Sequence, residues 1–370
     1  MYSQQELDDA VAAGAISAAA ADALRAHLES QRETVIPDEE QFRLLTGFND
    51  IFVSIAAVIL LVAVTWIGHS IGSSLGTDFD GEGPSFVGSL FMAATSWGLA
   101  LFFTAKRRMA LPSIILLLGF VMGVFGATAM VLGMTVGETR IDDSPQLGAV
   151  LGSVAAAVAA GAAWLHWRKF RVPITVAAGA AAVAGIAVGL LVAAIGGPEA
   201  AGAYNIVLSF VLLLGIGMFL FAMWWDGSDR ARLTRRSDVA FWLHLLAAPM
   251  IVHPVFTLLG LNNGSATLGE GLVVVLLYLA LGVTALAVDR RALLVSALAY
   301  VLWALSDLFQ RFGAVELNVA LTALIIGSSL LLLSAFWHQA RSAIVRPLPQ
   351  GLRDRLPLLD RAIASPQPAA

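Results

Sequence analysis

The chain has 370 residues, of which 58% are hydrophobic and 13% are charged. A soluble domain has about 45–50% apolar and about 25% charged residues, so this composition excludes an ordinary soluble enzyme, a disordered protein and a nucleic-acid-binding protein. Cysteine is absent, which excludes disulfides, thiolate nucleophiles and cysteine-ligated metals. We therefore predict an all-α, polytopic transmembrane helix bundle that contacts the lipid bilayer.

The first 45 residues are polar and predict a cytoplasmic, acidic helical hairpin. One helix is expected over about 4–13, ending at Gly14, and a second over about 17–33, with Ser17 as its N-cap. The segment has three arginines and nine acidic residues, a balance that disfavours docking on anionic lipid. A solvated hairpin is the simpler interpretation, and a protein-interaction module is the alternative.

A transmembrane region is predicted over residues 46–338. Each of its apolar stretches is about the 17–25 residues needed to cross a bilayer core. The eighth and ninth are the shortest and lie close together, so one re-entrant unit is the alternative interpretation of these two. The ten stretches are 49–71, 86–105, 110–132, 146–166, 173–195, 203–225, 239–260, 271–288, 292–309 and 316–337.

The distribution of basic residues sets the orientation. With the N-terminus inside, 20 of the 22 basic residues fall in inside segments, and only Arg140 and Arg311 fall outside. The positive-inside rule predicts this asymmetry, so we expect ten spans with both termini cytoplasmic. Arginine greatly outnumbers lysine and alanine is abundant, which suggests a GC-rich bacterial genome and hence a bacterial plasma (inner) membrane.

Small residues indicate where helices pack closely. Gly119 and Gly123 form one GxxxG pair, and the fourth and fifth stretches each contain another. Such spacing lets helix backbones approach each other within a membrane. We expect these positions at the centre of the bundle, and the alternative is a dimer interface.

The tail, residues 339–370, is basic and contains several prolines. Four apolar residues in it recur at helical spacing, and we expect them to lie on the cytoplasmic leaflet as a short surface helix. A loose solvated tail is the alternative. The four residues are Leu352, Leu356, Leu359 and Ile363.

The seventh stretch, 239–260, is the richest in groups that could carry function. Pro249 and Pro254 remove backbone donors inside it, so we expect the helix to break near Leu245 and Met250. Broken helices at mid-membrane are typical of transporter binding sites, and ionisable residues at that depth suggest function.

A substrate or ion site is predicted around His253. Counted along the helices, His253 lies about 21 Å and Asp307 about 22 Å from the inner side, so the two could form a pair. His244 is nine residues before His253 and therefore on the opposite helix face, which disfavours a metal site between these histidines. His69, Glu316 and Asn318 lie at the same outer surface and complete the candidate set. The simpler alternative is that carbonyl groups satisfy the histidines and that Asp307 reaches the outer interface.

Catalytic motifs are lacking, so we predict no catalytic residue, cofactor or metal site. The string Gly72-Ser-Ser-Leu-Gly76 matches G-x-S-x-G, but it leaves a transmembrane helix instead of following a strand. The sequence has no H-E-x-x-H and no G-x-x-x-x-G-K motif. An enzyme is therefore not favoured.

Two segments resemble other sequences. Residues 7–28, LDDAVAAGAISAAAADALRAHL, look like the opening of a bacterial family of multi-pass membrane proteins of unknown function. Members begin with a short cytoplasmic helical pair, followed by a polar hinge and a first span. Residues 237–256, with FWLHLLAAP and HP, look like a stretch found in uncharacterised bacterial membrane proteins. The resemblance implies a membrane fold and no catalytic residues.

Taken together, these patterns favour a transporter or permease-like protein for a small solute or ion, with its site at the proline-containing seventh span. The alternative is a non-transporting membrane scaffold or sensor that binds a protein partner through the N-terminal hairpin. The sequence does not set an oligomeric state.

Overall fold

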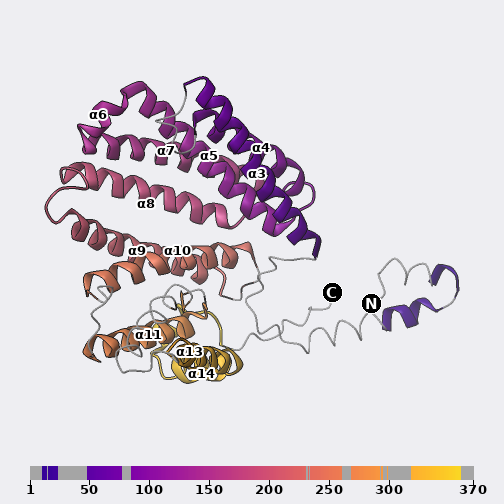
Figure 1. Ribbon diagram of the computed structural model, residues 1–370. Coiled ribbons are helices and arrows are strands. Elements are labelled where there is room, and N and C mark those ends of the chain that lie inside the picture. The colour runs from indigo at the N-terminus through magenta and orange to yellow at the C-terminus, as the bar shows by residue number, and fades with distance from the viewer. Residues whose placement is uncertain are drawn as a thin grey trace. The chain divides into compact units, whose positions relative to one another are not determined.

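The computed structural model shows a helical protein (Figure 1). The residues that it describes contain helices and turns and no strand, which confirms the all-α prediction for that part of the chain. Residues 11–14 and 16–23 belong to one compact unit, and the other described residues belong to a second, Arg43–Leu359. The described residues are 11–14, 16–23, 48–76, 85–230, 232, 234–260, 268–291, 293–294, 298 and 318–359.

Seven helices are long and apolar enough to cross a membrane, so the chain is a multi-pass membrane protein. They are α3 (Phe48–Ser74), α4 (Phe86–Phe103), α5 (Ala110–Val136), α7 (Pro145–Phe170), α8 (Ile174–Ala194), α9 (Ala203–Gly227) and α10 (Arg235–Leu258).

Five further helices occur in the described part of the chain. They are α6 (Glu138–Asp142), α11 (Leu268–Val288), α13 (Asn318–Ala335), α14 (Trp337–Val345) and α15 (Gln350–Arg353). The eighth predicted stretch corresponds to α11 and the tenth to α13, but most of the ninth, 292–309, lies outside the described residues. A count of ten spans thus stays a prediction.

Local signals explain several helix ends. Ser85 caps α4 by accepting a hydrogen bond from the Gly88 amide, and Thr234 caps α10 in the same way through the Arg236 amide. Ser17 accepts from the Ala20 amide, and Gly14 has a φ of 72°, which confirms the predicted cap and stop in the N-terminal segment.

Helices α3, α4 and α5 pack through small residues. A Cβ atom added to Gly68 of α3 would lie 2.7 Å from the Gly88 Cα of α4. One added to Gly123 of α5 would lie 2.7 Å from the Ala93 amide nitrogen of α4. The Gly123 contact agrees with the predicted close packing, whereas Gly152 of α7 has open space around it.

Helix α10 runs as one α-helix across both Pro249 and Pro254, where the sequence predicts a break. Pro254 has no amide hydrogen to donate to the Met250 carbonyl one turn earlier. Gly215 of α9 lies against that carbonyl, because an added Cβ atom would be 2.8 Å from the Met250 oxygen. A glycine Cα–H facing the oxygen is a weak donor, and it provides contact where the helical bond is missing.

The C-terminal segment packs onto this helical unit. Leu356 is buried with Val288 and Val345, and Leu359 packs beside them. Helix α15 has only four residues, and Leu352 is exposed. This arrangement differs from the predicted surface helix, because two of its apolar residues are covered by the protein itself. Ile363 lies outside the described residues.

Candidate functional site: a buried charged junction

Asp226, in the last turn of α9, is the centre of a buried ionic cluster. Its side chain is fully buried, and both carboxylate oxygens contact Arg290, which follows α11. Arg290 Nε lies 3.2 Å from Asp226 Oδ2, and a terminal guanidinium nitrogen bonds Oδ1. Two-point contact of this kind is the strong form of the arginine–carboxylate pair. Arg290 also donates to the Ser237 carbonyl of α10 at 2.9 Å, so one side chain joins three helices.

His244 of α10 is the third member of the cluster. Its Nε2 lies 3.0 Å from Asp226 Oδ2, and the residue is completely buried. The ring of Phe219 meets it edge-on, with centroids 5.2 Å apart. Within the described part of the chain, Nδ1 has no hydrogen-bond partner. The imidazole therefore donates from Nε2, and its other nitrogen faces apolar surroundings.

A second ionic group, around Asp289, adjoins the first. Arg232, in the turn between α9 and α10, lies 3.1 Å from Asp289 Oδ2 and donates to the carbonyls of Val288 and Asp289. The indole nitrogen of Trp337 donates to Asp289 Oδ1 at 2.8 Å, and Arg341 Nε lies 3.7 Å from the same oxygen. Asp289 and Arg290 are adjacent in the sequence, but Asp289 belongs to the second ionic group and Arg290 to the first.

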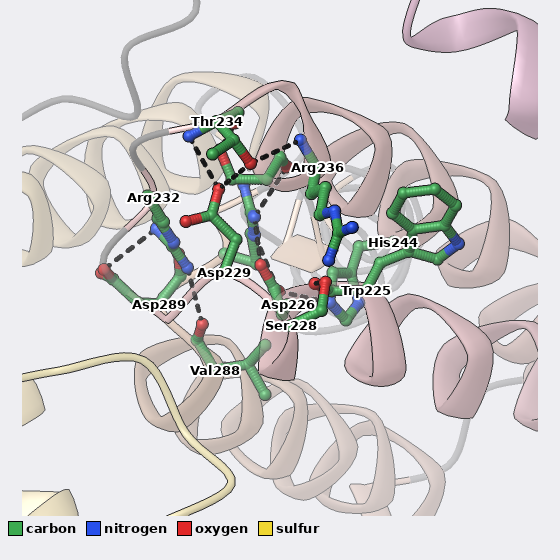
Figure 2. Close-up of polar contacts among 12 residues, drawn as sticks. Trp225, Asp226, Ser228, Asp229, Arg232, Thr234, Arg236, His244, Val288 and Asp289 are labelled. Atoms are coloured by element: carbon green, nitrogen blue, oxygen red, sulfur yellow. Dashed lines mark hydrogen bonds and ion pairs between the residues drawn. The ribbon is translucent and has the colours of Figure 1, made fainter.

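The turn that positions Arg232 is itself ordered by side chains (Figure 2). Asp229 Oδ2 accepts from both the amide and the hydroxyl of Thr234, at 2.9 and 2.7 Å. Arg232 has a φ of 56°, which is unfavourable for a residue with a Cβ atom. Its three contacts with Val288 and Asp289 offset this strain.

Arginines also hold the C-terminal segment. Arg230 donates to the carbonyls of Arg353 and Leu356, at 3.1 and 2.9 Å. Arg341 donates to the carbonyls of Pro357 and Leu358, at 2.7 and 3.1 Å. Four backbone acceptors of a segment that is mostly not helical are therefore satisfied by two side chains.

We call the two adjoining ionic groups, centred on Asp226 and Asp289, the charged junction. They bring three buried guanidinium groups together with two carboxylates at one end of α9, α10 and α11. A buried ion pair that loses one partner leaves an uncompensated charge, which is strongly destabilising. No group of three residues that could hold a metal ion occurs in the described part of the chain. The junction members are Asp226, Arg232, His244, Asp289, Arg290, Trp337 and Arg341.

The structure places only some of the predicted site residues. His253 is exposed on α10 and does not belong to the charged junction. Asp307 and Glu316 lie outside the described residues. Asn318 begins α13. The proposed pairing of His253 with Asp307 therefore stays a prediction.

The remaining candidates are dispersed among different helices. His69 of α3 is half-buried and meets Trp66 edge-on, with ring centroids 6.3 Å apart. Pro249 is exposed and Pro254 is buried in α10. Of the predicted set, only His244 belongs to the charged junction.

Sequence reasoning missed most of the junction, because it treated Arg232, Arg290 and Arg341 as inside-loop charges. The available signal was Asp226, an acidic residue directly after an apolar stretch, and the adjacent Asp289–Arg290 pair after another. Asp226 and Arg290 are 64 residues apart in the sequence, so only the packing of the helices shows that they are partners.

A second buried histidine, His166, lies in α7. Its Nδ1 is 3.2 Å from the Thr175 hydroxyl of α8. The rings of Trp97, Phe120 and Phe170 surround it, with centroids 4.6 to 6.2 Å from its own. No charged residue contacts this imidazole within the described ranges, so the aromatic group serves packing between α4, α5, α7 and α8.

Comparisons with protein-family models, with curated proteins and with solved structures found no match.

Proposed function

We propose that the chain is a ten-span protein of the bacterial plasma membrane with both termini in the cytoplasm, of the uncharacterised multi-pass family that residues 7–28 resemble. The described basic turns support this topology. Along the chain, the connections after α4, α7, α9 and α11 alternate with those after α3, α5, α8 and α10. The first set of connections, with the helix ends beside them, contains nearly all the basic residues near the described helix ends. Arg140 is the exception.

We further propose that the protein is a permease for a small solute or ion, with α10 as its central moving helix. The observation that carries this proposal is the burial of α10. Half of the residues in the most apolar 18-residue segment of α10 are buried, whereas the buried share of the same segment in the other six long apolar helices does not exceed 28%. The same helix contains two prolines, which weaken its backbone bonding, and a buried histidine in an ionic cluster.

The charged junction would then act as the cytoplasmic gate. It joins the inner ends of α9, α10 and α11 through Asp226, Arg290 and His244. Ionisable residues inside a membrane protein are costly to keep and usually mark a pathway. Breaking the contacts of Arg290 with Asp226 of α9 and with the Ser237 carbonyl of α10 would free these two helices from α11, and re-forming them would close that end.

Cysteine labelling tests this proposal, because the native chain has no cysteine to interfere. Ala247→Cys places a thiol on the buried face of α10, and Ala155→Cys places one at an equally buried position of α7. In a permease, combining Ala247→Cys with Asp226→Asn should raise the rate of maleimide labelling at least several-fold. Ala155→Cys with the same substitution should stay unlabelled.

The exposed turn residue Ser228 provides the positive control, since a cysteine there should react at once in every background. Equal labelling of Ala247→Cys with and without Asp226→Asn would contradict the gate. Equal increases at positions 247 and 155 would show general unfolding instead of opening.

The outer part of the proposed pathway keeps His253 and Asp307 as solute or ion ligands. A ligand that binds the folded protein raises the melting temperature by mass action. A panel of ions, amino acids, sugars and nucleosides should give a shift that His253→Ala and Asp307→Ala each abolish. A shift that both variants retain would remove these residues from the site.

A membrane scaffold or sensor is the second candidate, with the N-terminal hairpin as its binding module. The described residues 11–14 and 16–23 belong to a different compact unit from residues 48–359, as expected for a separate interaction module. In that case deletion of residues 1–45 should abolish partner capture, and Asp226→Asn should change only stability.

A further inference from the structure

Two exposed basic segments at the inner end of the bundle have no carboxylate partner among the described residues. The turn after α4 contains Lys106, Arg107 and Arg108. The last turn of α7 contains Arg168 and Lys169, and Arg171 follows it; all six side chains are exposed. Within the described residues none of the six forms an ion pair. We call these six residues the basic rim. They differ from Arg232, Arg290 and Arg341, whose guanidinium groups contact carboxylates and carbonyls.

Aromatic rings lie directly beneath three of these cations. The guanidinium carbon of Arg168 lies 4.9 Å from the ring centroid of Trp164, and that of Arg107 lies 5.5 Å from the ring of Phe102. Trp164 and Phe102 are 58% and 44% exposed, and in a membrane helix such faces contact lipid. The cations are therefore held at the boundary between acyl chains and headgroups, where interfacial tryptophan is typical.

The backbone of both turns is unfavourable for arginine. Arg108 and Arg171 each have a φ of 55°, a conformation in which glycine would avoid steric strain. Arg232 has nearly the same φ, but it makes internal contacts that offset the strain. In the basic rim, the Arg171 amide donates to the Trp167 carbonyl at 3.0 Å, and its guanidinium carbon lies 5.6 Å from the centroid of the Trp167 ring. The left-handed conformation belongs to the C-cap of α7, and the guanidinium group remains exposed and accessible to an external anion.

The two turns lie at the same end of neighbouring helices. Phe103, at the end of α4, and Phe170, at the end of α7, both pack against the group formed by Ala57, Leu61, Ala100 and Leu116. Helix α5 packs against both α4 and α7. Six positive charges thus occur on adjoining turns, next to lipid-facing rings.

We propose that the basic rim binds the headgroup phosphates of anionic phospholipids. Arginine suits this role because its planar guanidinium matches phosphate oxygens in a two-point contact. The acyl chains would lie along the exposed faces of Trp164 and Phe102. Clusters of basic residues at the cytoplasmic ends of spans are known to attract anionic lipid. This inference concerns the membrane environment of the protein and is independent of transport.

Thermal unfolding of the purified full-length chain tests the proposal. It would be measured in nanodiscs of phosphatidylcholine alone and of phosphatidylcholine mixed with phosphatidylglycerol, the probe lipid. The wild type should melt at a higher temperature in the mixed lipid. Arg168→Gln combined with Lys169→Gln and Arg171→Gln should lose at least half of that increase. The matched control, Arg235→Gln with Arg236→Gln and Arg353→Gln, removes three exposed charges elsewhere and should keep it.

Arg171→Gly gives a second, independent readout. Relief of the backbone strain should raise its melting temperature in phosphatidylcholine, while its response to phosphatidylglycerol should fall. A purely structural arginine would lose stability in both lipids, and that result would overturn the proposal. So would an undiminished response of the triple variant, or an equal response of the wild type to inorganic phosphate without phosphatidylglycerol. A lipid response that appears only after deletion of residues 1–45 would assign the basic rim to the chain's own acidic segment and would likewise overturn it.

Discussion

Helices α3, α4 and α5 meet through glycine, alanine and serine, whereas α9, α10 and α11 add carboxylates and guanidinium groups to small-residue contacts such as that of Gly215 with Met250. In the first region, Gly68 approaches Gly88 so closely that a single added carbon would clash with backbone. In the second region, Asp226 binds Arg290 and His244 in a fully buried site. Both regions are helical and apolar overall, and their interfaces obey different physics.

A close contact between two helix backbones has a single arrangement, because it contains no side-chain groups that could change partners. It contains no charge, and its stability comes from dispersion forces and from close fit. An ionic interface can be opened and closed, because each charged group has alternative partners. The difference suggests a fixed frame formed by α3, α4 and α5 and a movable element formed by α10 and its neighbours.

The largest effect is expected at the charged junction. Asp226→Ala leaves Arg290 buried without its carboxylate, which should lower the free energy of unfolding by about 3–5 kcal/mol. The loss would be measured by denaturant unfolding in detergent micelles. Apolar replacement of the whole group, Asp226→Leu with Arg290→Met and His244→Phe, is the matched control and should recover most of the loss. If this triple variant is as unstable as Asp226→Ala, lost packing and not lost charge compensation explains the effect.

The next effect tests the fixed frame. Gly123→Ala places a methyl group 2.7 Å from the Ala93 amide nitrogen, so the backbone of α4 or α5 must shift. Overpacking of this kind should lower the free energy of unfolding by about 1–3 kcal/mol. The measurement is the same unfolding titration. A neutral or stabilising result would show that the interface between α4 and α5 yields, and the contrast between the two regions would fail.

A smaller effect is expected at the edge of the junction. Trp337→Phe removes the indole donor to Asp289 but retains a smaller aromatic ring, and it should lower stability by about 1 kcal/mol. Trp66→Phe is the matched control, since Trp66 is exposed on α3. The melting-temperature changes of the two variants would be compared, and a larger decrease is expected for Trp337→Phe. Equal changes would mean that the Trp337–Asp289 hydrogen bond contributes nothing.

The smallest effect has the opposite sign. Gly161 of α7 has no neighbouring atom within 4 Å of an added Cβ atom, so Gly161→Ala should stabilise the helix by about 0.5–1 kcal/mol. The same chemical change therefore destabilises at Gly123 and stabilises at Gly161. A scan of both variants by differential scanning calorimetry would check this, and a loss of stability at Gly161 would reveal a contact absent from the described structure.

The sequence predicted helices well, because hydropathy is a local property. The stretch 49–71 corresponds to α3 (Phe48–Ser74), and 146–166 corresponds to α7 (Pro145–Phe170). Close packing was predicted less well. The GxxxG spacing marks a face of small residues without saying what faces it, so Gly123 is tightly packed and Gly152 is not.

The candidate site could not have been read from the sequence. Asp226 and Arg290 belong to different helices, and each looks like an interfacial charge when its own segment is considered alone. Only His244 was among the predicted residues, and it was chosen for its place in a proline-containing span. Its partners depend on which helices pack together, which hydropathy does not specify. Likewise, the predicted break in α10 ignored the support that Gly215 of α9 gives to the Met250 carbonyl.

The adjacency of Asp289 and Arg290 has a consequence for how the protein assembles. Membrane helices insert individually and pack afterwards, so α11 must find its correct depth against helices that are already in place. A shift of α11 by one residue in one direction would bring Asp289 to the place of Arg290 beside Asp226, and a shift in the other direction would bring Arg290 to the place of Asp289 beside Arg232 and Arg341. Either shift would replace an attractive contact by a repulsive one. The two adjacent opposite charges thereby favour a single depth of α11 relative to the ends of α9 and α10.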